Sequence, residues 1–592
     1  AAAAGRLSRR GARVAAAACA GAMLAAAGLQ LRHALRAQWR ASGPAFVGAA
    51  ERSGPRALRA RLAATATQEK NDQKQEQKQG KQAKPTVQEE ALKITPRAED
   101  YNQWYVDVID RADLVDDAPV RGCKILRPAG FAIWENIQRL LDPKFKRLSV
   151  ENAYFPLLIP VSFLAKEAAH VEGFATECAV VTHHRLRSVQ VAGKNGETTS
   201  SVEVDPDSEL ADPYVVRPTS ETVVWHMYGK WIKSYRDLPM RMNQWVNVMR
   251  WERRTKPFLR SAEFLWQEGH TAHATKEEAE AQAREILDVY VWLAQEQLGL
   301  PLFPGRKSDR ERFAGADETY TIEALAQNGM AIQAGTSHFL GQNFAKAFDV
   351  QYQTEETGDF KYVWATSWGV STRLIGATIM AHSDDTGLVL PPAVAAIQVV
   401  IVALFHKKAE TQNAIFEAAK ALRDTVEAQG IRVHVDDRVG LKPGLKYFEW
   451  ERKGVPLRIE LGARDLENGV GMAKRRTGGD KFQVSLSDAA TEVPQALDSV
   501  RLALRERSEA LKERLTTRIG SRAEFDARLE ASEIGMMLVP WGGDSDDEEK
   551  LQEDTGVTLR CYPFEQDPLP EGQACPLTGK PARIWALFAK SY

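Results

Sequence analysis

The sequence predicts a multidomain protein that combines an α+β domain with α/β domains. Its 592 residues suffice for about three or four domains, and 44% hydrophobic with 27% charged residues is ordinary for a soluble globular chain. In residues 215–273, charged, hydroxyl and aromatic side chains alternate with short apolar runs, which indicates paired strands. After Pro391 and Pro392, apolar strands instead alternate with amphipathic helices, which indicates a separate α/β domain. The net charge of -1 favours no class of partner.

Residues 1–67 differ in kind from the rest of the chain. They are rich in Ala and Arg, and Glu51 is their only acidic residue. Such a segment cannot bury a core and fits a targeting presequence. Residues 14–29 resemble the apolar region of a signal peptide, and residues 31–62 resemble an Arg-rich transit peptide. This two-part pattern predicts a plastid, with a mitochondrion as the alternative, and the polar tract after it predicts a flexible linker over residues 68–93.

The cysteines and the apolar runs indicate the redox state of the compartment and whether the chain crosses a membrane. Five cysteines are too few and too scattered for a disulfide framework, so we expect a reducing compartment. The apolar run inside the presequence is too short for a membrane span, so we expect no membrane partner.

The folded part begins with two amphipathic helices, the second over residues 130–141. Residues 152–160 predict an apolar strand, and Pro156 within it belongs at an edge or a bulge, which suggests a subunit boundary. Residues 185–212 are polar and predict an exposed excursion that carries no chemistry. The long amphipathic helix predicted over residues 276–299 serves packing.

Two facing strands within the first polar region carry the first candidate site. With a period of two, one strand places Arg250 and Glu252 on one face, and the return strand places Phe264, Trp266 and Glu268 on one face. An arginine fork suits phosphate or carboxylate oxygens, and an aromatic face stacks on a base. The grouping indicates a nucleotide site, and a surface hairpin with ion pairs stays open as the alternative.

The run AIQAGTSHFLGQNF forms a second candidate cluster. Its first glycine lets the backbone approach a ligand, and its polar side chains supply donors and acceptors, namely Gln333, Thr336, Ser337 and His338. Whether His338 binds a ligand or is a satisfied structural residue stays open. Arg373 follows just before an apolar helix, where a buried cation needs an anionic or aromatic partner.

The α/β domain after Pro392 is predicted to end near residue 498. Its polar positions mix both signs of charge, which suits the reading of base edges in exposed RNA better than the gripping of phosphate. The remaining residues predict a charged helix and then a small α/β unit that finishes in an apolar tail.

Over residues 94–592 the sequence resembles the prolyl-tRNA synthetase family of class II aminoacyl-tRNA synthetases, in the eukaryotic and archaeal form also found in plant and algal organelles. The resemblance rests on RPTSET, RWE with FLRSAEFLWQEGH, GTSH, SWGVSTR, HSDDTGLVLPP, PGLKYFEWERKGVPLRIELG and the terminal Tyr592. It implies a class II antiparallel-sheet catalytic domain over residues 94–392, an α/β anticodon-binding domain over residues 393–498 and a small α/β C-terminal domain over residues 499–592.

The resemblance also implies a reaction. L-proline is activated with ATP to prolyl-adenylate and is then transferred to the 3′ end of tRNA(Pro), with Mg²⁺ bound beside the ATP phosphates. Neither step needs a covalent protein nucleophile, so positioning and charge neutralisation can supply most of the barrier lowering. Pro156 would be the motif 1 proline at the interface of a homodimer.

The family's motifs also imply roles for individual residues. The implied catalytic residues are Arg250 and Glu252 of motif 2 and Arg373 of motif 3. The implied ATP-binding residues are Arg250, Glu252, Arg260, Ser261, Phe264, Gln333, Thr336, Ser371 and Arg373. The implied proline-binding residues are Thr219, Glu221, Arg250, Phe155, Trp266, Glu268, His270, His338 and Ser367. The implied anticodon-reading residues are Arg438, Lys446, Glu451 and Arg458.

Within these sets, Arg250 would bridge the proline carboxylate and the α-phosphate. Arg260 would reach the outer phosphates, and Phe264 and Arg373 would sandwich the adenine. Thr219 and Glu221 would bind the secondary ammonium of proline, which has two N–H donors.

Two features depart from relatives in the family. Residues 273–366 are occupied by the long helix and the GTSH cluster, which leaves no room for the editing domain of the bacterial form. Cys561 and Cys575 stand where several relatives place four cysteines, and two thiolates do not close a tetrahedral site, so we expect no structural zinc.

Two other functions stay open at this point. One is a synthetase-like RNA-binding protein that has lost catalysis, which the presence of Thr219, Glu221, Arg250, Arg260 and Arg373 disfavours. The other is a related synthetase for threonine or glycine, against which only the resemblance argues.

Overall fold

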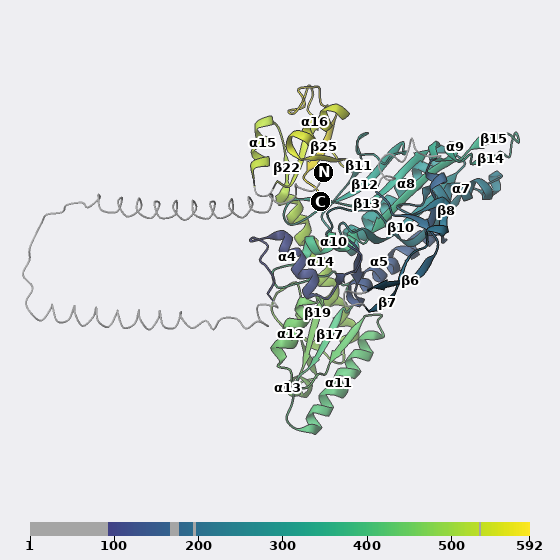
Figure 1. Ribbon diagram of the computed structural model, residues 1–592. Coiled ribbons are helices and arrows are strands. Elements are labelled where there is room, and N and C mark those ends of the chain that lie inside the picture. Colours follow the sequence, from purple (N-terminus) through teal and green to yellow (C-terminus); the bar gives the residue numbers. More distant parts are fainter. Residues whose placement is uncertain (1–92, 166–176, 193–196, 532–533) are drawn as a thin grey trace, which may run out of the picture. The chain divides into compact units, whose positions relative to one another are not determined.

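The computed structural model describes residues 93–165, 177–192, 197–531 and 534–592 (Figure 1). The predicted presequence, and the predicted linker up to residue 92, lie outside the described residues. None of the helices in the described ranges combines the length and the apolar character that a membrane crossing requires.

Two helices open the described chain, as the sequence predicts. Helix α4 (Tyr101–Arg111) begins where the Asp100 carboxylate accepts hydrogen bonds from two backbone N–H groups of the first turn. Helix α5 (Pro128–Arg147) begins with a proline, whose missing N–H costs nothing there, and extends past the predicted range at both ends. Between them β1 (Val115–Asp117) pairs with β2 (Lys124–Leu126).

A largely antiparallel sheet forms the centre of the catalytic domain, which confirms the predicted fold class (Figure 1). Its strands, in spatial order, are β11 (Leu302–Arg306), β12 (Glu318–Leu325), β13 (Ala331–Gly341), β16 (Trp364–Ser371), β10 (Glu263–His273), β9 (Met240–Met249) and β3 (Glu151–Asn152). Helices α8 (Lys276–Val291) and α10 (Arg373–His382) pack against it. Ile286, Ile322 and Leu374 are fully buried between these layers, and burying such a side chain contributes about 1.5–3 kcal/mol.

The segment between β10 and β16 is fully described and belongs to the catalytic domain. Helix α8 continues as a π-helical turn, η3 (Trp292–Gln297), and the chain then forms the three strands β11 to β13. The rest of the segment comprises α9 (Asn343–Ala347), β14 (Gln351–Gln353) and β15 (Phe360–Tyr362). This segment therefore contains no separate domain.

The motif 2 loop differs from the sequence-based expectation. Strand β9 ends at Met249, so Arg250 and Glu252 follow the strand instead of sharing one of its faces. Arg250 N–H still donates to Ala262 O at 2.8 Å, and beyond it the chain forms a loop in which Lys256 and Arg260 exchange backbone hydrogen bonds of 2.6 and 2.9 Å.

Pro156 is also placed differently, in an irregular segment between β3 and β4 (Leu158–Pro160), because proline has no N–H to donate to a ladder. Strand β4 belongs to a second sheet with β8 (Glu209–Val216) and β5 (Val180–His183), and β8 leads into helix α7 (Glu221–Trp231). The short helices of this region are α6 (Val161–Ala165), η1 (Pro206–Ser208) and η2 (Tyr235–Asp237).

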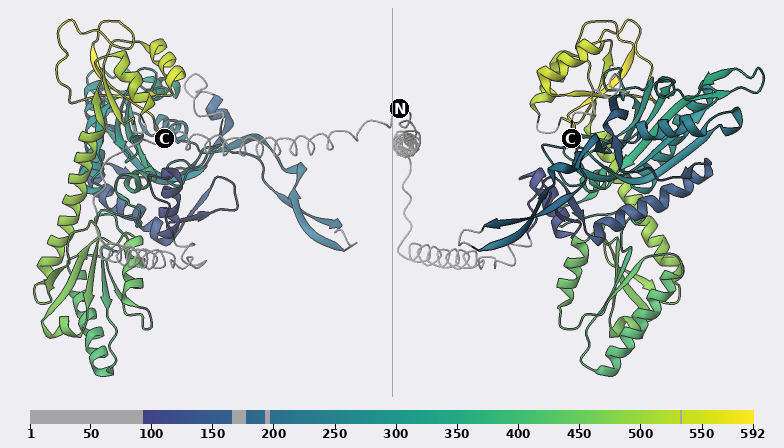
Figure 2. Two further views of the ribbon diagram at one scale, coloured as in Figure 1. Left: turned by 90° about the vertical axis from the view of Figure 1, so that its left-hand side faces the viewer. Right: turned by 45° about the vertical axis from the view of Figure 1, so that its right-hand side comes forward.

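The predicted polar excursion is a β-hairpin of β6 (Leu186–Ala192) and β7 (Thr198–Val204), which extends away from the catalytic domain (Figure 2). Nearly all of its side chains are exposed on both faces. The prediction of an exposed excursion is therefore confirmed, although the segment is regular and not a loop.

The predicted anticodon-binding domain is an α/β fold around a five-stranded sheet. In spatial order its strands are β18 (Val433–Asp436), β17 (Val399–Ala403), β19 (Leu457–Leu461), β20 (Val470–Arg475) and β21 (Phe482–Ser485). Helices α11 (Ala409–Glu427) and α12 (Pro443–Arg452) form the crossovers that let the first three strands run parallel. The short helix α13 (Ala463–Glu467) joins β19 to β20. Strand β17 is buried throughout, as a central parallel strand should be.

Helix α14 (Ala489–Leu515) carries the chain onward, so the predicted boundary at residue 498 falls inside one helix. It contacts α11 and, at its other end, β22 (Thr516–Arg518) of the C-terminal domain (Figure 2). The other elements of that domain are α15 (Arg522–Glu530), β23 (Met536–Trp541), α16 (Ser545–Thr555), β24 (Thr558–Pro563) and β25 (Ile584–Ala589). Because β24 pairs with β11, the C-terminal strands extend the catalytic sheet to eleven strands.

A buried ion cluster joins the C-terminal domain to the catalytic sheet. Arg560 on β24 donates two hydrogen bonds of 3.1 and 2.9 Å to one carboxylate oxygen of Glu323 on β12, and Lys307 lies 2.9 Å from the other oxygen. Burial acts to raise the pKa of Glu323, but the charges of Arg560 and Lys307 outweigh it and lower the pKa to about 2. Loss of one partner would leave a buried charge unpaired, so the cluster ties the two domains together.

Glu548 makes stability depend on pH. This buried side chain on α16 accepts a 3.0 Å hydrogen bond from Ser308 Oγ. Burial, with a smaller effect of the Glu311 charge, raises the pKa of Glu548 from 4.5 to about 7. The folded state therefore binds this proton more tightly than the unfolded state, and stability falls as pH rises from about 4.5 through about 7.

We expect Glu548→Gln to remove this loss. Its Tm should lie above that of the wild type near about pH 8, and the difference should shrink or reverse near about pH 5. Melting curves across this range check the prediction, with the exposed neighbour Glu549→Gln as a control that should follow the wild type. A difference between Glu548→Gln and wild type that does not change with pH would contradict it.

Candidate active site

Three neighbouring strands bring polar residues from distant segments into rows across the catalytic sheet. The register pairs His270 of β10 with Ser367 of β16, and Ser367 with His338 of β13. The next row on the same face contains Glu268 and Thr336. Residues of the implied proline-binding set therefore lie next to Thr336 of the implied ATP-binding set.

Glu268 is the buried acceptor at the centre of these rows. Its Oε1 accepts hydrogen bonds from Ser220 Oγ at 2.6 Å and from Gln244 Nε2 at 2.7 Å, and its Oε2 lies 3.2 Å from His270 Nε2. Burial acts to raise the pKa of Glu268, but its hydrogen bonds and the charge of His270 hold the pKa below the usual value. Burial lowers the pKa of His270, whereas Glu268 raises it above the usual value. The two form a hydrogen-bonded, buried pair.

Glu221 adds a second buried carboxylate beside this pair. It is the first residue of α7, where the positive end of the helix dipole stabilises a carboxylate. Thr219 Oγ1 donates a hydrogen bond to Glu221 Oε2, so the two residues predicted to hold the proline amine are joined. The neighbouring carboxylates of Glu221 and Glu268 suit an ammonium group.

Three buried polar atoms around the pocket have no hydrogen-bond partner in the described part of the chain. They are His270 Nδ1, Ser367 Oγ and Trp266 Nε1. Leaving such a group unpaired costs about 1–3 kcal/mol, and buried polar groups in native proteins are nearly always satisfied. All three residues belong to the predicted proline-binding set, so this end of the pocket suits a small polar ligand.

His338 and Phe155 have partners of their own. His338 Nδ1 lies 2.9 Å from Thr319 Oγ1, and its ring stacks on Phe313 with centroids 4.6 Å apart. Burial lowers the pKa of His338 to about 3, so the ring is neutral. Phe155 is buried, and its ring lies 6.0 Å from that of Trp231. Contacts of both side chains with proline stay predictions.

Arg250 lies between two aromatic rings and the carboxylates of this site. Its Nε donates a hydrogen bond of 3.0 Å to Pro218 O, and its guanidinium carbon lies 5.7 Å from the ring centroid of Phe264 and 5.3 Å from that of Trp266. Burial lowers the pKa of Arg250, while the charges of nearby carboxylates, with Glu221 first among them, act to raise it. The arginine is thus held between the carboxylates and the aromatic wall.

Two further arginines converge on the same place. Arg373, the first residue of α10, donates from Nε to Leu259 O at 3.1 Å and from Nη1 to Gln333 O at 3.4 Å. Arg260 is half-exposed, and its Nη1 lies 3.7 Å from Glu252 Oε2.

These arginines leave an excess of positive charge. Burial, and then the charges of Arg260 and Arg250, lower the pKa of Arg373 to about 10, which shows that the guanidinium groups repel one another. The N-terminus of α10 adds positive potential. A polyphosphate would relieve this repulsion through charge-assisted hydrogen bonds.

The remaining candidates for ATP lie around the same arginines. Thr372 N–H donates to Leu265 O at 3.0 Å, which brings the start of α10 to the residue after Phe264. An adenine site between Phe264 and Arg373 stays a prediction. Ser371 Oγ accepts a hydrogen bond from the Arg373 backbone at 3.2 Å. Ser261 Oγ instead donates to a backbone carbonyl two residues on, at 2.8 Å, so its hydroxyl hydrogen already has an acceptor.

Sequence reasoning missed the residues that hold this site in place. Ser220 and Gln244 fix Glu268, and the buried Arg217 donates to Phe155 O at 2.7 Å and to Asn247 O at 2.8 Å. The sequence could have indicated Arg217, the first residue of RPTSET, because it directly follows an apolar run. An arginine buried there needs hydrogen-bond partners. Gln244 carries no comparable signal, since its role depends on a strand register that the sequence does not display.

The predicted anticodon-reading residues are largely engaged inside their own domain. Lys446 is buried, with Nζ 3.2 Å from Asp436 Oδ1, and Arg438 donates to the same carboxylate at 2.9 and 2.7 Å. Arg458 is also buried and donates to Glu451 Oε1 at 2.6 Å. These four residues do not form one open face, and their contacts with tRNA stay predictions.

The two C-terminal cysteines are buried thiols. Burial raises the pKa of Cys561 well above its usual value, so this thiol is protonated. Across the described ranges, no three His, Cys, Asp or Glu residues are grouped as metal ligands. The absence of structural zinc stays a prediction, and about one zinc ion per chain in metal analysis of the purified protein would contradict it.

An antiparallel sheet that gathers three arginines beside two buried carboxylates, followed by an α/β domain, is the arrangement expected of a class II aminoacyl-tRNA synthetase. The family model of the class II core domain (G, H, P, S and T) matches residues 201–382. The anticodon-binding domain matches residues 398–496, and the C-terminal domain of prolyl-tRNA synthetase matches residues 523–592.

Relatives identify the family. The proline–tRNA ligases of Porphyromonas gingivalis and Bacteroides fragilis are each 50% identical to this chain over 503 and 501 residues, which are 85% and 84% of this chain and 99% of each relative. A crystal structure of prolyl-tRNA synthetase from Cryptosporidium parvum, complexed with halofuginone and AMPPNP, has a TM-score of 0.76 and 36% identity, and the match covers 85% of this chain and 97% of that one. The chain belongs to the prolyl-tRNA synthetase family.

Proposed function

We propose that this chain activates L-proline with ATP and transfers it to tRNA(Pro) in an organelle, as a homodimer. One observation carries the activation step. A pocket with two buried carboxylates and three unpartnered polar atoms adjoins a cluster of three arginines, so one end suits an amino acid and the other a polyphosphate. The family membership narrows the amino acid to proline.

The carboxylate end of the pocket would bind the amino acid. The secondary ammonium of proline has two N–H donors, which Thr219 and Glu221 would accept. Trp266 and His270 would bound the ring, and the hydrogen bond between His270 and Glu268 holds these two side chains in place. Binding in a fixed orientation replaces a bimolecular encounter by a positioned one.

Arg250 would join the two substrates. The proline carboxylate attacks the α-phosphate in line, a new C–O–P linkage forms, and the bond from the α-phosphorus to pyrophosphate breaks. Arg250 would neutralise both anions as they approach, and Arg260 would stabilise the charge that develops on the leaving pyrophosphate. ATP enters as its magnesium complex, so Mg²⁺ belongs to the substrate. In the second step the terminal hydroxyl of the tRNA attacks the prolyl carbonyl, and AMP leaves.

The homodimer is proposed from the surface around Pro156. Tyr154 is 74% exposed and Leu158 is 40% exposed, so apolar surface flanks this proline. Sedimentation of the purified protein tests the proposal, and a sedimenting mass near 65.8 kDa, that of one chain, would contradict it.

The organellar location is proposed from composition alone. Residues 1–67 combine arginine and alanine with a single acidic residue, as plastid presequences do. Fusing these residues to a fluorescent reporter tests the proposal. Import into plastids supports it, import into mitochondria supports the alternative, and retention in the cytosol contradicts both.

Charging of a tRNA(Pro) transcript with labelled proline tests the whole reaction. We expect charging that depends on ATP and on this tRNA, and replacing one anticodon base should lower kcat/KM by about tenfold or more, because a lost pair of base contacts costs about 1–3 kcal/mol. Binding of the tRNA without charging would support the catalytically inactive RNA-binding alternative instead.

A further inference from the structure

Helix α10 runs from the active site to the edge of the anticodon-binding domain. Arg373 lies at its start, and the turn Asp384–Gly387 follows its end. Within this turn Asp384 and Gly387 exchange backbone hydrogen bonds of 3.1 and 3.2 Å. Eight of the ten residues of α10 are buried, so a shift at its end is passed along a packed, rigid element.

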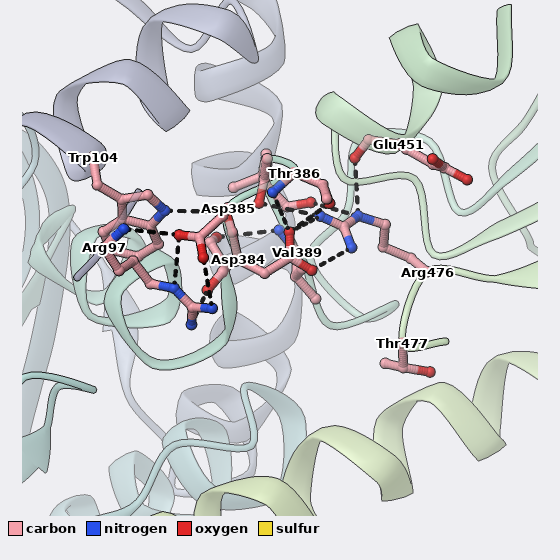
Figure 3. Close-up of polar contacts among 12 residues, drawn as sticks. Arg97, Trp104, Asp384, Asp385, Thr386, Val389, Glu451, Arg476 and Thr477 are labelled. Atoms are coloured by element: carbon pink, nitrogen blue, oxygen red, sulfur yellow. Dashed lines mark hydrogen bonds and ion pairs between the residues drawn. The ribbon is translucent and has the colours of Figure 1, made fainter. Parts of the chain in front are cut away.

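The catalytic domain holds this turn from one side (Figure 3). Trp104 Nε1 donates a hydrogen bond of 3.0 Å to Asp384 O. Arg97 donates to Asp385 Oδ1 from its backbone N–H at 2.9 Å and from Nε at 3.0 Å. These contacts keep the turn in place without any help from the anticodon-binding domain.

The anticodon-binding domain holds the same turn from the other side, through Arg476, the residue after β20. Arg476 Nη1 and Nη2 donate to the two carboxylate oxygens of Asp384, each at 2.7 Å (Figure 3). Burial acts to raise the pKa of Asp384, but the hydrogen bonds and the charge of Arg476 outweigh it and lower the pKa to about 2. The pair is therefore fully charged at neutral pH, in the bidentate geometry that gives strong, directional hydrogen bonds.

Arg476 also binds the backbone on both sides of the domain boundary. Its side chain is 6% exposed, and its Nε donates to Leu388 O at 3.0 Å and to Glu451 O at 2.9 Å. The backbones themselves meet here, because a Cβ added at Gly387 would lie 2.7 Å from Arg452 Cα. A movement of α12 therefore reaches the turn directly.

Glu451 connects Arg476 to the predicted anticodon-reading residues. The Glu451 carbonyl accepts the hydrogen bond from Arg476, and its carboxylate accepts one of 2.6 Å from Arg458. The three residues line one shallow surface hollow. A base that displaced the carboxylate of Glu451 from Arg458 would disturb the backbone that Arg476 holds.

We propose that Arg476 is a positioning residue, which couples anticodon binding to the orientation of Arg373 through Asp384 and α10. The proposal rests on the proposed function, since it concerns the rate of tRNA charging. Arg476 touches no substrate in this role. A cognate anticodon would raise kcat as well as affinity, because it would favour the arrangement of α10 that serves transfer.

The test measures kcat and KM of charging for wild type and Arg476→Met, with tRNA(Pro) and with the same tRNA after one anticodon base is replaced. In the wild type, the replacement should raise KM and lower kcat by roughly fivefold or more, the usual size of such coupling. In Arg476→Met the rise in KM should remain, while the kcat values for the two tRNAs should become equal. Proline-dependent pyrophosphate exchange without tRNA should stay within about twofold of wild type, because Arg373 keeps its own contacts.

Arg97→Met is the matched control. Arg97 holds the same turn, but its hydrogen bonds in the described chain all lie within the catalytic domain, so the variant should keep the wild-type dependence of kcat on the anticodon. Asp384→Asn provides a second test should Arg476→Met fail to fold. It removes the charge pair but leaves Arg476 three backbone carbonyls, and it should also equalise the two kcat values.

Two results would overturn the proposal. One is a wild-type dependence of kcat on the anticodon in folded Arg476→Met and Asp384→Asn. The other is a fall in tRNA-free exchange that matches the fall in charging, which would mean that Arg476 only supports the structure. Absence of exchange in the wild type is a separate result, and it would contradict the proposed function.

Discussion

Replacing Arg250 by alanine is expected to abolish adenylate formation, with proline-dependent pyrophosphate exchange falling by roughly a hundredfold to a thousandfold or more. The reason is that Arg250 is the guanidinium held between the carboxylate pocket and the aromatic wall of Phe264 and Trp266. Without it, two anions must approach each other with no charge between them. Binding of tRNA should change little, because the predicted anticodon-reading residues lie in another domain.

Arg253→Ala is the matched control for this experiment. It removes the same charge from the same loop, but Arg253 has an 88% exposed side chain whose ion pair with Glu177 spans 3.8 Å. Exchange by this variant should stay near the wild-type rate. A wild-type rate of exchange in Arg250→Ala would show that the role assigned to Arg250 is wrong.

Replacing Glu268 by alanine is expected to destabilise the protein by about 3–5 kcal/mol and to remove proline activation. The substitution leaves Ser220 and Gln244 without their shared acceptor, and it leaves His270 without the carboxylate that raises its pKa. Urea denaturation measures the first effect, and pyrophosphate exchange by the folded fraction measures the second.

Glu263→Ala is the control that tests whether the loss of stability is specific to the buried Glu268. Glu263 lies on the same strand, but it is exposed and accepts a single hydrogen bond of 2.8 Å from Asn247 Nδ2, so its loss should cost no more than about 0.5 kcal/mol. Equal destabilisation by the two substitutions would contradict the central place given to Glu268.

The pH dependence of the Glu268 contribution has a definite sign. The lowered pKa of Glu268 gives stability that is present above its ordinary value of 4.5 and is lost as pH falls through the folded value. The raised pKa of His270 gives stability that is present below its ordinary value of 6.5 and is lost as pH rises through the folded value. The difference between wild type and Glu268→Ala should therefore be greatest between these two pH values.

Local patterns in the sequence predicted many elements of the fold, although Arg250, Glu252 and Pro156 lie outside the strands predicted for them. Alternating strands and helices after Pro392 gave the parallel sheet, because burial on both faces leaves a plain apolar signature in strands such as β17. The pairing of β24 with β11 could not be predicted in this way, since it depends on two edges that lie about 250 residues apart. The ion pair of Glu323 with Arg560 could not be predicted for the same reason, because it forms only when these distant strands come together.

The candidate site, too, could be predicted from the sequence only in part. Arg250 was predicted from the period of a strand and Arg373 because a buried cation needs a partner, whereas Glu221 was predicted only from the family resemblance. The resemblance also supplied the roles of all three. The register that places Ser367 between His270 and His338 appears only in the folded sheet. Lys446 and Arg458 illustrate the converse, because a charged residue in a sequence gives no sign of whether it is already paired inside its own domain.

Pyrophosphate exchange with four amino acids tests the central claim most directly. The protein is incubated with ATP and labelled pyrophosphate, and proline, alanine, threonine or glycine is added in turn. Exchange with proline should lie well above exchange with the other three, since the carboxylates match its secondary ammonium and Trp266 and His270 would bound its compact ring. Preference for another amino acid would contradict the assignment of the substrate, and exchange with none of them would contradict the assignment of an active synthetase.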